Sequence, residues 1–413
     1  MITTVNLLAT KGEVFSMIGG ILLAIVILLA MVTIHEFGHY IAGKWLGFRV
    51  NEFSVGFGPA LFKKRSKKTG ELFALRVIPL GGYCAFDGED EEETPQQDKE
   101  PKAEKTAENE PFNELINEVI SEEETPQKDA KEDLKEEYPE PKGARFNDQP
   151  PWKRIIVLIA GATMNYLLAL GLIVLMFACF GRPLYEVQKQ PAADGAQTVS
   201  VLQTGDRILK IEGKTMYMLT DYMDVLDGKK AGEEVDILLL REGKEQTVSL
   251  TLTADADIQN MSDTQTLLSA MGFSKGEGLR GEPTREGFFD TIGHSFMYSV
   301  KTGGTVLRSL GELLTGKLSI RSMGGPVTTI TVTAEAAKSG FASFLNIASF
   351  IGVNLAVFNL LPIPALDGSK VVFCLIEWIR RKPINRKVEA LIHFIGIVFL
   401  FGFAILVDIL QLF

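Results

Sequence analysis

The most prominent pattern in the chain is a set of four long stretches that are almost free of charged residues and are separated by polar segments. In the first stretch the only formal charge is Glu36. Each stretch is long enough for a membrane-crossing helix, which needs about 18 to 20 apolar residues. We therefore predict a mainly α-helical, multi-pass membrane protein, with four transmembrane helices at residues 14–43, 155–181, 339–366 and 390–410.

The segments between these helices show other periodicities. Residues 48–86 contain EFSVGFG and ELFALRVIPLGGYCAF, where apolar and polar positions alternate, which predicts a small membrane-associated β-sheet or re-entrant hairpin. Residues 186–255 alternate strand and turn signals around GDRILKIEG and predict a β-rich domain. Residues 285–335 place apolar side chains four positions apart, which predicts amphipathic helix at the membrane interface.

Charge is spread unevenly, so the net charge of −10 describes no single part of the chain. Residues 87–140 hold 22 acidic and 6 basic residues, a net charge of −16. This composition predicts that residues 87–145 form an acidic, disordered insert, interrupted by one short amphipathic helix at FNELINEVI, residues 112–120. Nothing in the charge pattern points to nucleic acid as a partner. The three widely spaced cysteines predict no disulfide framework.

Lysine and arginine residues near the ends of the predicted helices indicate how the chain is oriented. Basic residues cluster at 63–68, after the first helix, and at 380–387, after the third. The positive-inside rule places both loops in the cytosol. Both termini and the β-rich domain at 186–255 are then expected on the outer side.

The stretch MVTIHEFGHYIAG, residues 31–43, places three ionisable side chains in the first predicted helix. The spacing H-E-x-x-H puts His35 and His39 one turn apart on one helix face, where they can bind one zinc ion. Glu36, between them, can act as general base toward a water molecule at the metal. Ionisable groups inside a membrane are costly, at about 2.5–3.5 kcal/mol each, which favours a functional site over a polar cluster that only joins helices.

A catalytic zinc ion commonly takes three protein ligands and leaves one position for water. No further histidine follows His39 at a suitable distance, since the sequence continues YIAGKWLGFRV. The candidate is Asp367 in NLLPIPALDG, which closes the third uncharged stretch. The predicted orientation puts the ends of the first and third helices at a similar depth. A helix cap in a Pro/Gly turn is the alternative for Asp367, but it leaves Asn359 unexplained.

These motifs together resemble the site-2 protease family of intramembrane zinc metalloproteases, in particular the bacterial regulator of sigma-E protease group. The resemblance rests on HEFGH, on GATMN in the second helix, on NLLPIPALDG, and on a PDZ-like domain at 186–255. It extends over the chain except for the acidic insert, and some relatives have two PDZ-like modules where we see one.

The resemblance implies a zinc endopeptidase of the bacterial cytoplasmic membrane. Its zinc ligands would be His35, His39 and Asp367, with Glu36 catalytic and with Asn359 and Asn165 holding the substrate or its reacting carbonyl. The sheet at 48–86 would pair with an unwound substrate. The implied substrates are membrane-spanning segments of proteins such as anti-sigma factors, and remnant signal peptides.

Two other functions use the same features differently. A non-catalytic membrane scaffold would present the PDZ-like domain to partners, but it would have no need for Glu36. A metal transporter could use the two histidines and Asp367 as a translocation site, but it leaves the β-rich segments unexplained.

Overall fold

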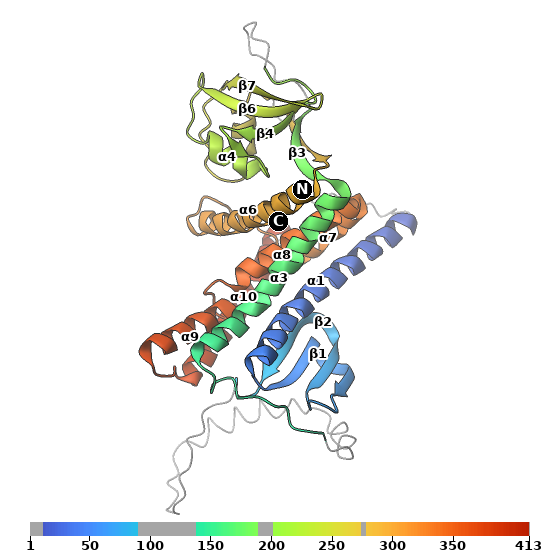
Figure 1. Ribbon diagram of the computed structural model, residues 1–413, viewed down its shortest axis with the longest axis vertical. Coiled ribbons are helices and arrows are strands. Elements are labelled where there is room, and N and C mark those ends of the chain that lie inside the picture. The colour runs from blue at the N-terminus through green and yellow to red at the C-terminus, as the bar shows by residue number, and fades with distance from the viewer. Residues whose placement is uncertain (1–10, 90–137, 189–200, 274–277, 413) are drawn as a thin grey trace, which may run out of the picture.

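The computed structural model describes residues 11–89, 138–188, 201–273 and 278–412. Most of the acidic insert, including the helix expected at 112–120, lies outside the described residues. Within them, four helical segments are long and apolar enough to cross a membrane: Ile18–Leu46, Pro151–Phe180, Phe341–Asn359 and Arg386–Gln411. They form the central part of the molecule, with one β-sheet at each end (Figure 1).

The first two of these segments belong to helices that cross closely, α1 (Lys11–Leu46) and α3 (Pro151–Phe180). A side chain on Gly38 of α1 would place its Cβ 2.4 Å from the carbonyl oxygen of Ala160 on α3. Small residues at a crossing allow backbones in apolar surroundings to approach and gain packing contacts. This crossing lies directly beside the HEFGH motif, so it fixes the position of the two histidines relative to α3.

The third apolar helix ends earlier than expected, and Asp367 begins a separate helix. Helix α8 covers Phe341–Asn359 and helix α9 covers Asp367–Arg380, whereas the sequence predicted one helix through residue 366. Pro362 and Pro364 lack the amide proton that a continuing helix requires and restrict the residues before them, so the chain leaves the helix here. Asp367 therefore lies in the first turn of α9.

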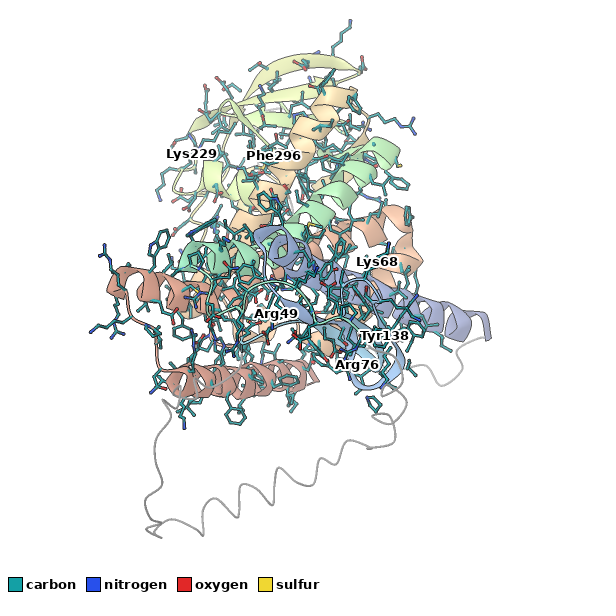
Figure 2. All side chains as sticks on the ribbon, turned by 60° about the horizontal axis from the view of Figure 1, so that its bottom comes forward. Arg49, Lys68, Arg76, Tyr138, Lys229 and Phe296 are labelled. Carbon is teal, nitrogen blue, oxygen red and sulfur yellow. The ribbon has the colours of Figure 1, made fainter. Side chains whose placement is uncertain are left out.

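The segment after α1 forms a long, bent hairpin of β1 (Val50–Arg65) and β2 (Leu72–Phe86). Phe53 pairs with Phe73 on one side and with Cys84 on the other, so the hairpin folds back on itself into a wider antiparallel sheet. Several of its apolar side chains are exposed: Phe57, Leu61, Phe62, Leu75, Val77 and Ile78. The hairpin lies beside the C-terminal part of α1 (Figure 1), and Tyr138 lies near Arg76 of β2 in Figure 2.

The sheet at the other end extends beyond the predicted 186–255. It has the strand order β7-β6-β4-β3-β8, with β5 paired to β4. Its strands are β3 (Arg182–Val187), β4 (Arg207–Ile211), β5 (Lys214–Thr215), β6 (Glu234–Arg241), β7 (Lys244–Thr251) and β8 (Leu279–Thr284). The last strand returns to pair with the first, with Arg182 opposite Thr284.

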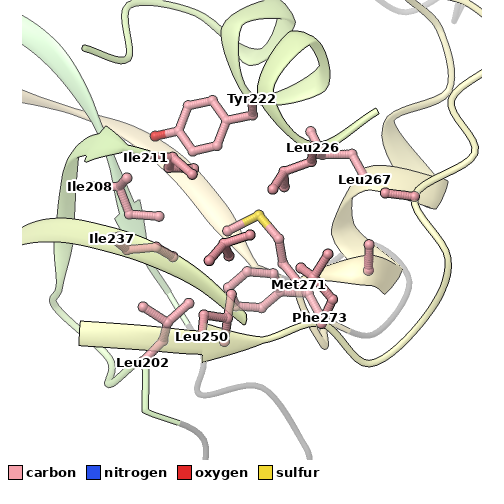
Figure 3. Close-up of a cluster of buried hydrophobic side chains, with 14 of the residues drawn as sticks. Leu202, Ile208, Ile211, Tyr222, Leu226, Ile237, Leu250, Leu267, Met271 and Phe273 are labelled. Atoms are coloured by element: carbon pink, nitrogen blue, oxygen red, sulfur yellow. The ribbon is translucent and has the colours of Figure 1, made fainter. Parts of the chain in front are cut away.

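This sheet has a hydrophobic core of its own, closed by the short helices α4 (Leu219–Leu226) and α5 (Thr264–Ala270) (Figure 3). Tyr222 of α4 and Leu267 of α5 are fully buried against the sheet residues Ile211 and Ile237. A separate core makes this part a domain in the structural sense.

The region expected to be amphipathic helix contains α6 (Phe288–Leu314), the short 3₁₀ helix η3 (Ile320–Ser322) and α7 (Pro326–Ser339). In α6 the apolar stripe faces outward, with Phe296 50% exposed, while Ser295 and Ser299 are fully buried. Helix α6 links the two halves of the molecule, because Ser299 hydrogen-bonds Tyr166 of α3 at 2.8 Å and Lys301 forms an ion pair with Asp221 of α4 at 2.6 Å.

The last helix, α10 (Arg386–Leu412), has mostly exposed apolar side chains, as a helix that faces lipid would have. It contacts the loop before Asp367 near Gly396, where an added Cβ would lie 2.4 Å from Pro364.

Candidate metal centre

His35 and His39 lie one turn apart on α1, and both point toward α3 and α9. Their side chains are buried, and the two Nε2 atoms lie 3.1 Å apart. The two rings therefore present their Nε2 atoms to the same point.

Asp367 completes this group from the start of α9. Its Oδ2 atom lies 3.0 Å from Nε2 of His35 and 3.4 Å from Nε2 of His39. The structure thus brings together three side chains from positions 35, 39 and 367, as one potential metal-binding cluster. Whether they are the zinc ligands stays a prediction.

The separations suit a zinc ion. Ligand atoms bound tetrahedrally at about 2.0–2.1 Å lie roughly 3.3 Å from one another, close to the three distances observed here. The surroundings of His39 also fit, because its Nδ1 lies 2.8 Å from the carbonyl oxygen of Val157. Because a carbonyl can only accept a hydrogen bond, Nδ1 carries the ring proton and donates it to this bond, and the lone pair of Nε2 is left for a metal.

Gly161 of α3 provides the space in which the two rings lie. A Cβ atom at this position would be 2.4 Å from Nε2 of His39 and 2.8 Å from Cε1 of His35. Glycine alone leaves room there for the rings and for an ion between them. This requirement was not apparent from the sequence, because it depends on how α3 packs against α1.

Glu36 faces the hairpin rather than α9. A backbone hydrogen bond from Cys84 of β2 reaches its carboxylate, and a Cβ on Gly82 would lie 3.3 Å from its Cγ. In the described part of the chain, residues 82–84 pair with β1 on one side and face Glu36 on the other. The predicted general base therefore lies at the free edge of a β-strand.

The two predicted asparagines both lie against His35. Nδ2 of Asn165, on α3, is 3.3 Å from Nδ1 of His35, and Nδ2 of Asn359, at the end of α8, is 3.4 Å from the same atom. Asn165 is almost fully buried, whereas Asn359 is partly accessible. Their proposed contact with substrate stays a prediction.

Two further contacts hold α9 and were not found by sequence reasoning. The backbone amide of Ala365, a residue with a left-handed φ of 79°, donates to Nδ1 of His393 on α10 at 3.1 Å. Buried Arg154 of α3 pairs with buried Glu377 of α9. Both contacts join residues far apart in sequence, and neither follows a recognisable motif.

A basic hollow of about 810 Å³ lies elsewhere, at the tip of the hairpin. Lys63, Lys64, Arg65, Lys67 and Lys68 line it together with Leu72, Phe73 and Tyr138. None of these residues belongs to the cluster around His35.

Comparison with known proteins now identifies the family. The family model described as Peptidase family M50 matches residues 23–403. The chain belongs to peptidase family M50. This membership confirms the prediction of a metalloprotease of the site-2 protease kind with zinc as its cofactor.

Among the M50 relatives is a protein named zinc metalloprotease RasP from Bacillus licheniformis, 30% identical, with 90% of this chain and 93% of the relative covered. Another is the regulator of sigma-W protease RasP from Bacillus subtilis, 28% identical, with 91% and 94% covered. A putative zinc metalloprotease from Clostridium perfringens is 29% identical, with 94% and 97% covered.

One solved structure also matches a part of this M50 chain. It is the PDZ domain of an SdrC-like protein from Listeria monocytogenes, with 28% identity, a TM-score of 0.15, and 17% of this chain and 73% of that chain covered. The family membership, by contrast, extends over the helices and the cluster of His35, His39 and Asp367. It favours an enzyme over a non-catalytic scaffold.

Proposed function

We propose that the protein is a zinc-dependent intramembrane endopeptidase that cleaves membrane-spanning segments of other proteins. One observation carries the proposal: His35, His39 and Asp367 converge with separations of 3.0 to 3.4 Å between helices apolar enough to cross a membrane. The proposed zinc ligands are these three residues.

Glu36 is the proposed general base. When bound, zinc supplies Lewis-acid chemistry that polarises a carbonyl and makes water a better nucleophile at neutral pH. Glu36 accepts the proton of the attacking water and passes it to the leaving amine, so that the peptide bond breaks into a carboxylate and an amine. Burial between α1 and β2 keeps the carboxylate in place for both transfers.

Asn165 and Asn359 are the amides nearest to His35. Amide N–H groups stabilise the negative charge that develops on a carbonyl oxygen during acyl transfer. The resemblance implies this role for both residues, and we assign it to Asn359, the more accessible of the two, as a holder of the substrate or its reacting carbonyl.

The hairpin offers a way to present an extended substrate. A helical segment hides its carbonyl groups in its own hydrogen bonds, so it must unwind before it can be cut. Residues 82–84 face Glu36 with one side unpaired in the described part of the chain, and an unwound segment added there as a strand would pass directly beside the base.

The distribution of charge and of sheets supports one orientation in a bacterial cytoplasmic membrane. The basic residues at 63–68 and 380–387 would lie in the cytosol, with both termini and the sheet domain outside. The two sheets lie at opposite ends of the helices (Figure 1), as this orientation requires. The sheet domain, PDZ-like in its sequence pattern, is proposed to act as a size filter on substrates.

The substrates we propose are anti-sigma factors and remnant signal peptides. A relative is named regulator of sigma-W protease, which supports regulatory membrane proteins as the substrate class.

Purified full-length protein in lipid nanodiscs, incubated with a model peptide containing one apolar helix, tests the proposal. We expect cleavage within the apolar segment, located by mass spectrometry, which a zinc chelator abolishes and added zinc restores. Cleavage outside that segment, or cleavage that persists after complete chelation, would contradict it.

A further inference from the structure

The two histidines of the cluster differ in what surrounds their second ring nitrogen. Nδ1 of His39 lies 2.8 Å from a backbone carbonyl oxygen, that of Val157. Nδ1 of His35 instead lies beside two side-chain amides, those of Asn165 and Asn359. A backbone carbonyl can only accept a hydrogen bond, whereas an amide can present either its oxygen or its NH₂ group.

A histidine that binds a metal through Nε2 carries its proton on Nδ1, and that proton is donated to an oxygen acceptor in almost every such site. His35 therefore needs an acceptor at Nδ1. Each of the two amides places its NH₂ group near this atom. Two hydrogen-bond donors would then face the Nδ1–H group, which is itself a donor.

Asn165 has the atom that resolves this conflict. Its Oδ1 is buried and has no hydrogen-bond partner among the described residues. A rotation of its amide by 180° about the last side-chain bond exchanges Oδ1 and Nδ2 without changing the shape of the group. The oxygen then lies about 3.3 Å from Nδ1 of His35, where the nitrogen is placed now.

We infer that Asn165 is a positioning residue whose Oδ1 accepts the Nδ1 proton of His35 and so directs the lone pair of Nε2 toward the metal. Asn359 then cannot bond to the protonated Nδ1, and its NH₂ group remains available for the substrate carbonyl. The two asparagines thus have separate roles, one toward the metal ligand and one toward the substrate. This inference rests on the proposed zinc site.

The positions of the two residues support this division. Asn165 is 1% exposed and lies in the middle of α3, one turn from Gly161, which contacts both histidine rings. Asn359 is partly exposed and lies at the end of α8, next to the irregular loop that leads to Asp367. A buried residue on a regular helix suits a fixed orientation, and an accessible one suits contact with a substrate.

The test compares the zinc affinity of purified full-length variants, measured by competition with a chromophoric chelator. Asn165→Leu should bind zinc about 10- to 100-fold more weakly, the usual effect of losing such a partner. Asn165→Asp, which keeps an acceptor oxygen, should bind zinc at least as tightly as the wild type. Asn359→Leu should keep wild-type zinc affinity and lose cleavage activity. Wild-type affinity in Asn165→Leu, or loss of affinity in Asn359→Leu, would overturn the inference.

A second measurement needs no variant. Nitrogen-15 NMR of zinc-loaded protein labelled only at its four histidines reports which ring nitrogens carry protons. We expect a protonated Nδ1 for His35, and a deprotonated Nδ1 would overturn the inference.

His35→Ala separates the role of Asn165 from the proposed function. If His35→Ala lowers zinc affinity while Asn165→Leu does not, the zinc site stands and the role of Asn165 falls.

Discussion

Glu36 and the histidines on either side of it share one helix but face different neighbours. His35 and His39 meet Asp367 of α9, whereas Glu36 meets Gly82 and Cys84 of β2. A hydrolytic site needs this separation, because the base must reach water and substrate and must not itself bind the metal.

Glu36→Gln keeps the shape of the side chain and removes its basicity. We expect zinc content to stay at the wild-type level and the cleavage rate to fall by about 100-fold or more, since a carboxamide accepts no proton. Zinc analysis and a peptide-cleavage assay on the same preparation check both parts. Glu335→Gln, an exposed acid on α7, is the matched control and should change neither. Wild-type turnover in Glu36→Gln would refute the role of the base.

At the residue scale, the sequence identified the groups that do chemistry better than those that position them. The spacing of His35 and His39 predicts one helix face with Glu36 between them, and the lone acid after an uncharged stretch pointed to Asp367. The acceptor for His39 is the backbone carbonyl of Val157, and any residue type has such a carbonyl. His393 was missed because its partner is the backbone amide of Ala365, in the loop before α9, and a contact with a backbone group leaves no motif in the sequence.

At the scale of secondary-structure elements, the site depends on the close packing of α1 against α3. Gly161 and Gly171 lie on the same helix, but an added Cβ at Gly161 would collide with both histidines and one at Gly171 would meet nothing within 4 Å. The two glycines therefore form a matched pair for mutagenesis.

We expect Gly161→Ala to lose zinc binding and cleavage together, since its methyl group would occupy the space of the two rings. Gly171→Ala should retain both and gain up to about 1 kcal/mol of helix stability. Zinc content, cleavage rate and thermal melting of the two variants provide the comparison. Normal zinc loading of Gly161→Ala would show that the rings do not lie where the structure places them.

The boundaries of the elements were harder to predict than their existence. All four long apolar helices were expected, because uncharged stretches are a strong signal. The end of α8 at Asn359 was not, since the prediction followed the uncharged run to Leu366, although Pro362 and Pro364 lie within it. The strand β8, with sequence LRGEPT, has no alternating pattern, and its pairing with β3 depends on the tertiary fold.

At the scale of the whole molecule, the sheet domain can be removed at a point where its two ends meet. Arg182 and Thr284 are paired in neighbouring strands, whose backbones lie about 5 Å apart, so a short Gly-Ser linker can replace residues 183–283. The domain has its own core, and the zinc cluster is formed by α1 and α9 at a distance from it in sequence and in space (Figure 1).

We expect this deletion to leave zinc content unchanged and to raise the cleavage of long, uncut substrates relative to short ones, because the proposed filter is gone. The measurement is the ratio of cleavage rates for a long and a short version of one substrate. An unchanged ratio in an active, zinc-loaded deletion protein would remove the filter from the proposal.

The central claim is that Asp367 joins His35 and His39 as a zinc ligand, and the most direct measurement is the zinc content of purified Asp367→Ala protein. Asp290 provides the control, since it is an exposed aspartate in the first turn of α6, as Asp367 is in the first turn of α9. We expect about one zinc ion per chain in the wild type and in Asp290→Ala, and little or none in Asp367→Ala, because two histidines alone leave zinc short of protein ligands. Full zinc occupancy in Asp367→Ala would contradict the three-residue site.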